Sequence, residues 1–136
     1  MMLEQQLRKY WFFNYTGGFS VNKNSKSIIE TLNYTKDLLN DNKNMVLLFP
    51  QGEIESMHRQ TFKFEKGIER VIKDKEGKIQ IIFMANLIDY FSSPKEGLYM
   101  HFSEYEKSDW SAATIEAGYN RFYQQCIDNQ NLLKIK

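Results

Sequence analysis

Hydrophobic and polar positions alternate along the chain in blocks, and each block has the period of one type of secondary structure. Four segments carry apolar residues at helical spacing, which predicts amphipathic helices. They are residues 2–13, 26–40, 63–74 and 109–128. Three further segments are apolar runs of strand length, which predict buried strands. They are residues 45–49, 79–88 and 98–102, and Phe19-Ser20-Val21 alternates like a short additional strand.

Helices and apolar strands follow each other along the chain, which indicates the α/β class. The uninterrupted run Met45–Phe49 suits a strand covered on both faces, so we expect a mostly parallel or mixed central sheet flanked by helices. In such sheets the functional loops lie beyond the carboxyl ends of the strands. The length of 136 residues fits a single domain that spans residues 1–136.

Composition narrows the class of protein further. Hydrophobic residues make up 42% of the chain, which is enough for a packed core and argues against disorder. The net charge of +1 offers no basic field, so we expect no nucleic-acid partner. The single cysteine, Cys126, excludes an internal disulfide framework and fits a reducing compartment, which predicts a cytoplasmic location. Its place on the apolar side of the last helical segment predicts a core residue rather than a nucleophile.

The stretch FPQGEIES, residues 49–56, is the best candidate for chemistry. Pro50 and Gly52 break the chain directly after an apolar run, and polar side chains crowd into the positions that follow. A plainer interpretation is a turn that ends a buried strand. The sequence contains no Gly-x-Ser-x-Gly elbow, P-loop or Gly-x-Gly-x-x-Gly, so the common hydrolase and nucleotide-binding motifs are absent.

Four blocks carry a resemblance to a known family. They are Gly17–Lys23 (GGFSVNK), Phe49–Gly52 (FPQG), Phe64–Gly67 (FEKG) and Ile81–Ala85 (IIFMA). Their order and spacing resemble the glycerolipid acyltransferases, the family of bacterial 1-acylglycerol-3-phosphate acyltransferases. The resemblance covers residues 1–105 and corresponds to the back part of the family's domain, with residues 2–13 matching a helix that precedes the second block.

The resemblance implies transfer of an acyl group from an acyl-CoA or acyl-carrier protein thioester to a hydroxyl or amine of a lipid acceptor. It implies no bound cofactor, and it leaves room for peripheral contact with the inner face of the membrane. The residues that it places on the acceptor side are Gly18, Lys23, Phe49, Pro50, Gln51, Gly52 and Glu53.

The family's first block is a His followed, after four residues, by an Asp, and that His is the general base. No such block precedes FPQG in this sequence. His101 and Glu106 have the same spacing but follow FPQG, so we expect a surface or strand-end histidine there, and His58 has Lys63 where the acid would stand. We therefore expect no catalytic residue in this chain, a truncated acyltransferase-like domain, and no activity from these residues alone.

Other departures change the acceptor side. The family's basic residues, which hold a phosphate, are replaced by Lys23 and Ile54, and Glu53 and Glu55 add negative charge. The sequence therefore predicts an acceptor without a phosphate at this spot, such as a glycolipid or aminolipid hydroxyl. Arg59, four residues after Glu55, could restore a phosphate contact.

Two other classes of function stay open. One is a non-catalytic lipid-binding or interaction domain that keeps the fold, and the other is an unrelated α/β domain in which FPQG is only a turn. A metal site is disfavoured, because Glu55 and His58 have Glu-x-x-His spacing without the second copy that di-iron bundles need. The truncated sheet also predicts exposed apolar surface beside it, or a homodimer that covers this surface.

Overall fold

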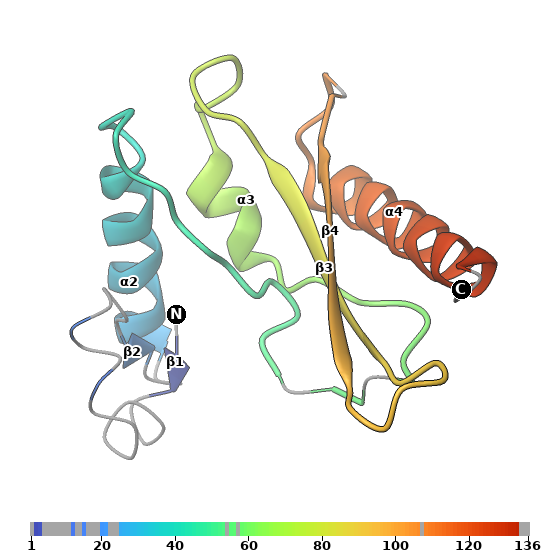
Figure 1. Ribbon diagram of the computed structural model, residues 1–136. Coiled ribbons are helices and arrows are strands. Elements are labelled where there is room, and N and C mark those ends of the chain that lie inside the picture. The colour runs from blue at the N-terminus through green and yellow to red at the C-terminus, as the bar shows by residue number, and fades with distance from the viewer. Residues whose placement is uncertain are drawn as a thin grey trace.

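The computed structural model describes residues 2–3, 12, 15, 20–21, 25–53, 55–56, 58–106 and 108–133. Its elements, in chain order, are β1 (Met2–Leu3), β2 (Ser20–Val21), α2 (Ser25–Leu38), α3 (Gly67–Ile72), β3 (Ile82–Asp89), β4 (Gly97–Glu104) and α4 (Ala112–Leu132). Helices thus combine with a small antiparallel sheet, so the chain is α/β at a coarse level. Figure 1 shows α2 and α4 on opposite sides of the molecule, with α3 and the hairpin between them.

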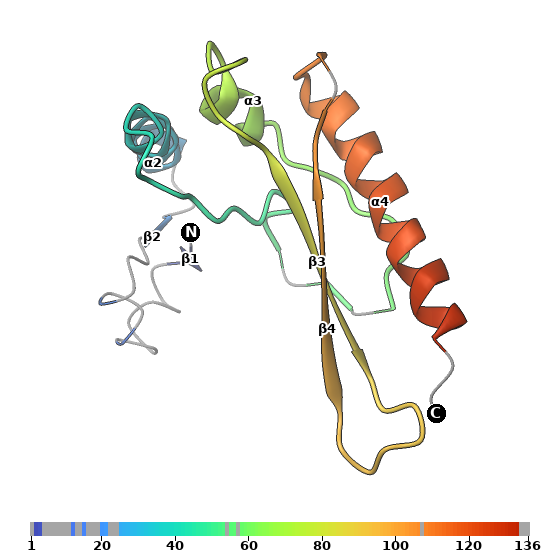
Figure 2. The ribbon, with the colours of Figure 1, turned by 45° about the horizontal axis from the view of Figure 1, so that its top comes forward.

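Strands β3 and β4 form an antiparallel hairpin whose register runs from Ile82 opposite Glu104 to Asp89 opposite Gly97. Successive side chains of a strand point to opposite faces. The face that carries Phe83 and Ala85 is buried, and α4 lies along it, as Figure 2 shows from the side. The other face of the hairpin is exposed.

The core lies between α4 and the inner face of the hairpin. It consists of Ile72, Phe83, Ala85, Tyr105, Ile115, Phe122, Tyr123 and Cys126. Helix α4 starts after Ser111, whose hydroxyl accepts a hydrogen bond from the Thr114 amide at 3.3 Å, as expected of an N-cap. Tyr119 donates its hydroxyl to the Met84 carbonyl at 3.3 Å, and burial raises the pKa of Tyr119 to about 12.

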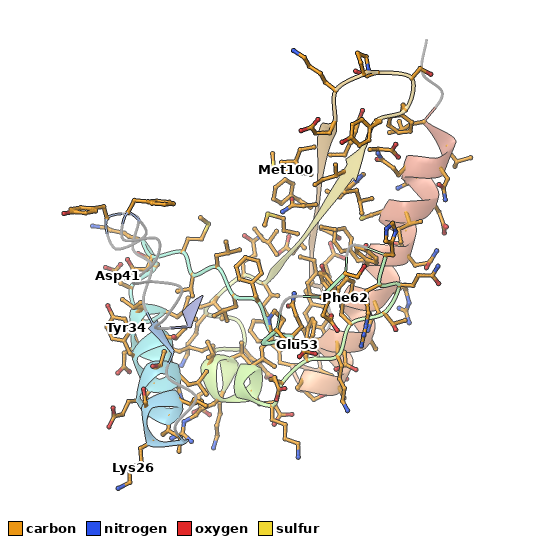
Figure 3. The ribbon with its side chains drawn as sticks, turned by 90° about the horizontal axis from the view of Figure 1, so that it is seen from below. Lys26, Tyr34, Asp41, Glu53, Phe62 and Met100 are labelled. Atoms are coloured by element: carbon orange, nitrogen blue, oxygen red, sulfur yellow. The ribbon has the colours of Figure 1, made fainter. Side chains whose placement is uncertain are left out.

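Polar side chains of α4 hold the segment that precedes α3. Asn120 accepts the Phe62 amide at 2.7 Å and donates to the Phe62 carbonyl at 2.9 Å. Glu116, one turn earlier, accepts the Phe64 amide at 2.6 Å. Phe62, which lies alongside α4 in Figure 3, also meets Tyr123 edge to face with ring centroids 4.8 Å apart. Backbone groups of a segment that lies outside the described helices and strands thereby find hydrogen-bond partners on the side chains of a helix.

Helix α2 packs against α3 and lies outside the aromatic core. Leu32 is buried beside Gly67, where an added Cβ would lie 3.3 Å from the Leu32 Cδ1 atom. Polar pairs surround this contact. They are Lys36 with Asp74 at 3.1 Å, Arg70 with Asn33 at 2.8 Å, and the Lys75 ammonium with the Asn40 side chain.

Five expectations on the elements are confirmed in type. Helices α2 and α4 lie in the two long amphipathic segments, β3 and β4 lie in two of the apolar runs, and Ser20–Val21 is a strand. Helix α3 is shorter than expected, because the backbone of Phe62 and Phe64 is hydrogen-bonded to side chains of α4 rather than within a helix.

Two expectations on the elements are wrong. Met45–Phe49 forms no strand ladder with any described residue. The described strands form an antiparallel pair, β3–β4, and a two-residue parallel pair, β1–β2, so the mostly parallel or mixed central sheet stays a prediction. Apolar composition favours burial but does not choose a strand partner. Met2–Leu3 lies in a strand, where a helix was expected, and pairs in parallel with Ser20–Val21. Most of the segment 2–13 lies outside the described residues.

Candidate functional site

The FPQG stretch forms a tight turn. The Phe49 carbonyl accepts the Gly52 amide at 3.2 Å, and Gly52 has a φ of +71°, which favours glycine. Pro50 and Gln51 are partly buried, whereas Phe49 and Glu53 are exposed. The turn therefore presents Glu53, labelled in Figure 3, to solvent together with the half-exposed Phe49 side chain.

The FPQG turn is bonded to the FEKG block that follows it in the chain. The Glu65 amide donates to the Pro50 carbonyl at 2.8 Å. An added Cβ at Gly52 would lie 3.1 Å from the Glu65 Cγ atom. Helix α3 then begins at Gly67. Two of the blocks that carry the family resemblance thus lie in direct contact.

We expect Gly52→Ala to lower the free energy of unfolding by more than Gly77→Ala does. Both glycines have nearly the same positive φ, +71° and +70°, so both substitutions carry the left-handed penalty of about 1–2 kcal/mol. Only the Cβ at position 52 meets another atom within 4 Å, on Glu65. Urea denaturation measures both losses, and the difference isolates the contact between the two blocks. Equal losses would show that this contact has no energetic weight.

The two glutamates at or after the turn differ in exposure and in pairing. Glu55 pairs with Arg59 at 3.1 Å, one helical turn apart in sequence, and only 9% of the Glu55 side chain is exposed. Arg59 is therefore engaged by a carboxylate, and its Nε also donates to the Thr61 carbonyl at 3.3 Å. Glu53 remains as an exposed negative charge at the turn.

The structure describes five of the seven predicted site residues. Phe49, Pro50, Gln51, Gly52 and Glu53 lie together in the turn. Gly18 and Lys23, as well as Ile54, lie outside the described residues, so their position relative to the turn stays a prediction.

The structure also describes three residues that the sequence analysis excluded from catalysis, Cys126, His101 and Glu106. Cys126 is buried in the core with its thiol pKa raised by burial, which confirms a structural role. His101 was expected at the surface or a strand end, but it lies inside β4, partly buried, with a buried Nε2 that has no hydrogen-bond partner among the described residues. Glu106 is exposed beyond the end of that strand.

Sequence reasoning missed Glu116 and Asn120, which fix the chain leading into the FEKG block. The available sign was their spacing, since two hydrogen-bonding side chains four residues apart share one side of a helix. Both are partly buried.

Within the part of the chain that the structure describes, no three His, Cys, Asp or Glu side chains are grouped so that they could hold a metal ion. Among the described helices, none is long and apolar enough to cross a bilayer. Comparison with protein-family models, with curated protein sequences and with solved structures finds no match.

Proposed function

We propose that these residues form the acceptor-side part of a lipid acyltransferase site. The observation that carries the proposal is the hydrogen bond of 2.8 Å between the Glu65 amide and the Pro50 carbonyl. It brings together the FPQG and FEKG blocks, which resemble consecutive blocks of the glycerolipid acyltransferase family. The family's larger parallel or mixed sheet flanked by helices is part of the same proposal.

The reaction is acyl transfer from an acyl-CoA or acyl-carrier protein thioester to a lipid hydroxyl. The hydroxyl oxygen attacks the thioester carbonyl, the carbon–sulfur bond breaks, and the thiol leaves with the proton that a general base removes from the hydroxyl. No His with an Asp five positions later precedes FPQG in residues 1–136. The base is therefore supplied from outside these residues, and this chain by itself binds without turnover.

The acceptor carries no phosphate beside the turn. Glu53 is exposed there, and the guanidinium of Arg59 is paired with Glu55. A phosphate placed at the turn would meet a like charge without a free arginine in the described loop to offset it. A glycolipid or aminolipid hydroxyl meets no such repulsion.

We expect Glu53→Gln to strengthen binding of lysophosphatidic acid about two- to fivefold, because removal of one exposed like charge is worth up to about 1 kcal/mol. Binding of a phosphate-free monoacylglycerol should change less. Glu76→Gln is the matched control, since Glu76 is exposed in the loop after α3 and away from the turn. Calorimetric titration of each lipid, with palmitoyl-CoA as the donor probe, gives the affinities.

The outcomes separate the open interpretations. Binding of palmitoyl-CoA or monoacylglycerol by the 136-residue chain supports a site of the acyltransferase kind, and no binding of any of these lipids contradicts it. If lysophosphatidic acid binds the wild type best, the phosphate-free acceptor is wrong. Thioester turnover with a base-containing partner segment distinguishes an enzyme from the alternative, a non-catalytic lipid-binding domain.

A further inference from the structure

The outer face of the β3–β4 hairpin has no cover among the described residues. The register and the alternation of side chains assign to this outer face Ile82, Met84, Asn86, Ile88, Leu98, Met100, Phe102 and Glu104. Six of these residues are apolar, and all of them except Met84 are between 51% and 59% exposed. Met100, labelled in Figure 3, lies at its centre, directly opposite Asn86. The inner face, in contrast, is packed against α4.

We propose that the outer face is an interface with a second copy of this chain, in which two hairpins pack face to face across a two-fold axis. Two sheets of this kind lie about 10 Å apart with their strands within about 30° of each other. A two-fold axis makes the contact self-complementary and closed, so the assembly ends at a dimer. The proposal does not depend on the acyltransferase activity proposed above.

The exposed area is sufficient for a weak but specific dimer. A half-exposed large apolar side chain presents on the order of 100 Å² to solvent. The outer face therefore offers roughly 500 Å² per copy, or about 1,000 Å² in the dimer, which is near the lower limit for a specific interface. Interfaces near this lower limit are typical of weak and transient complexes.

Asn86 favours a second copy over a lipid surface. It lies in the middle of the outer face, where acyl chains would leave its amide without a hydrogen-bond partner. Across a two-fold axis, the Asn86 amides of the two copies lie near each other, and each can donate to and accept from the other. The charged residue of the face is Glu104, an acid, and anionic lipid headgroups are bound by Lys and Arg.

Light scattering and sedimentation equilibrium of the 136-residue chain test the proposal. The mass should rise from 16.2 kDa toward twice that value as the concentration increases from about 1 to about 100 µM. Met100→Lys should raise the dimer dissociation constant about tenfold or more, because it places two ammonium groups beside the axis. Met45→Lys, at a methionine that is 93% exposed outside the hairpin, is the matched control and should leave it unchanged.

A second variant excludes a folding defect as the cause. Asn86→Asp changes hardly any volume at an exposed position, so the monomer should keep its far-ultraviolet circular dichroism, yet two carboxylates facing each other should abolish the dimer. The proposal is overturned if the wild type keeps a mass of 16.2 kDa at all concentrations. It is also overturned if Met45→Lys weakens the dimer as much as Met100→Lys does. A monomer that floats with phosphatidylcholine–phosphatidylglycerol vesicles would instead assign the outer face to a lipid surface.

Discussion

Alanine in place of Phe83 lowers the free energy of unfolding by about 3–5 kcal/mol. The ring is 8% exposed and is surrounded by Tyr105, Tyr119 and Phe122, with ring centroids 5.5–5.9 Å away. Its removal leaves a cavity between the hairpin and α4 that these rigid rings cannot close. Since small domains are stable by only about 5–15 kcal/mol, the variant should be close to the limit of folding. Urea denaturation followed by circular dichroism measures the loss.

Phe102→Ala is the matched control, because Phe102 lies on the opposite face of the same hairpin and is 59% exposed. Measured in dilute solution, where the chain is monomeric, this variant should lose about 1 kcal/mol or less. If the two variants lost similar stability, the assignment of the inner face as the core would be wrong.

Asn120→Ala should lower the free energy of unfolding by about 2–4 kcal/mol. The substitution removes both hydrogen bonds to the backbone of Phe62 and leaves a partly buried amide and carbonyl without partners, each worth about 1–3 kcal/mol. It should also loosen the chain that leads to Glu65, and with it the hydrogen bond to Pro50. Denaturation in urea gives the first effect, and amide exchange at Glu65 gives the second.

Asn129→Ala is the control for this prediction, since Asn129 lies exposed on the same helix. Asn120→Asp keeps the acceptor for the Phe62 amide and loses only the donor, so its loss should fall between the other two. A loss in Asn120→Ala no larger than that in Asn129→Ala would mean that solvent satisfies the Phe62 backbone equally well.

Helices and strands whose apolar residues recur at a regular spacing could be predicted from the sequence. Helix α4 repeats apolar residues on one side over 21 residues, and the buried Ile115, Phe122 and Cys126 lie on that side. Helix α2 likewise buries one side, on which Leu32 and Thr35 lie three residues apart. Apolar runs likewise located β3 and β4, because strands pack at least one face.

The segments that pair or pack with each other could not be predicted in the same way. Met45–Phe49 is as apolar as β3, yet an apolar run contains no information about which strand it pairs with. The contact between Phe62 and Asn120 joins residues 58 positions apart, and no local pattern indicates such a pair. The turn at FPQG was predictable from its Pro and Gly, but its contact with FEKG was not. Arg59 was considered as a phosphate contact, whereas its spacing of four residues from Glu55 corresponds to the observed ion pair.

Helix α2 contributes no residue to the aromatic core and packs on α3 instead, which gives the molecule two levels of stability. The hairpin and α4 share one aromatic core, so they can open only by losing most of the buried apolar area together. Helix α2 is attached to α3 through Leu32 and a set of polar pairs such as Lys36 with Asp74. Separation of α2 therefore requires only a part of the global free energy, and α2 forms a unit that unfolds locally while the remainder stays native.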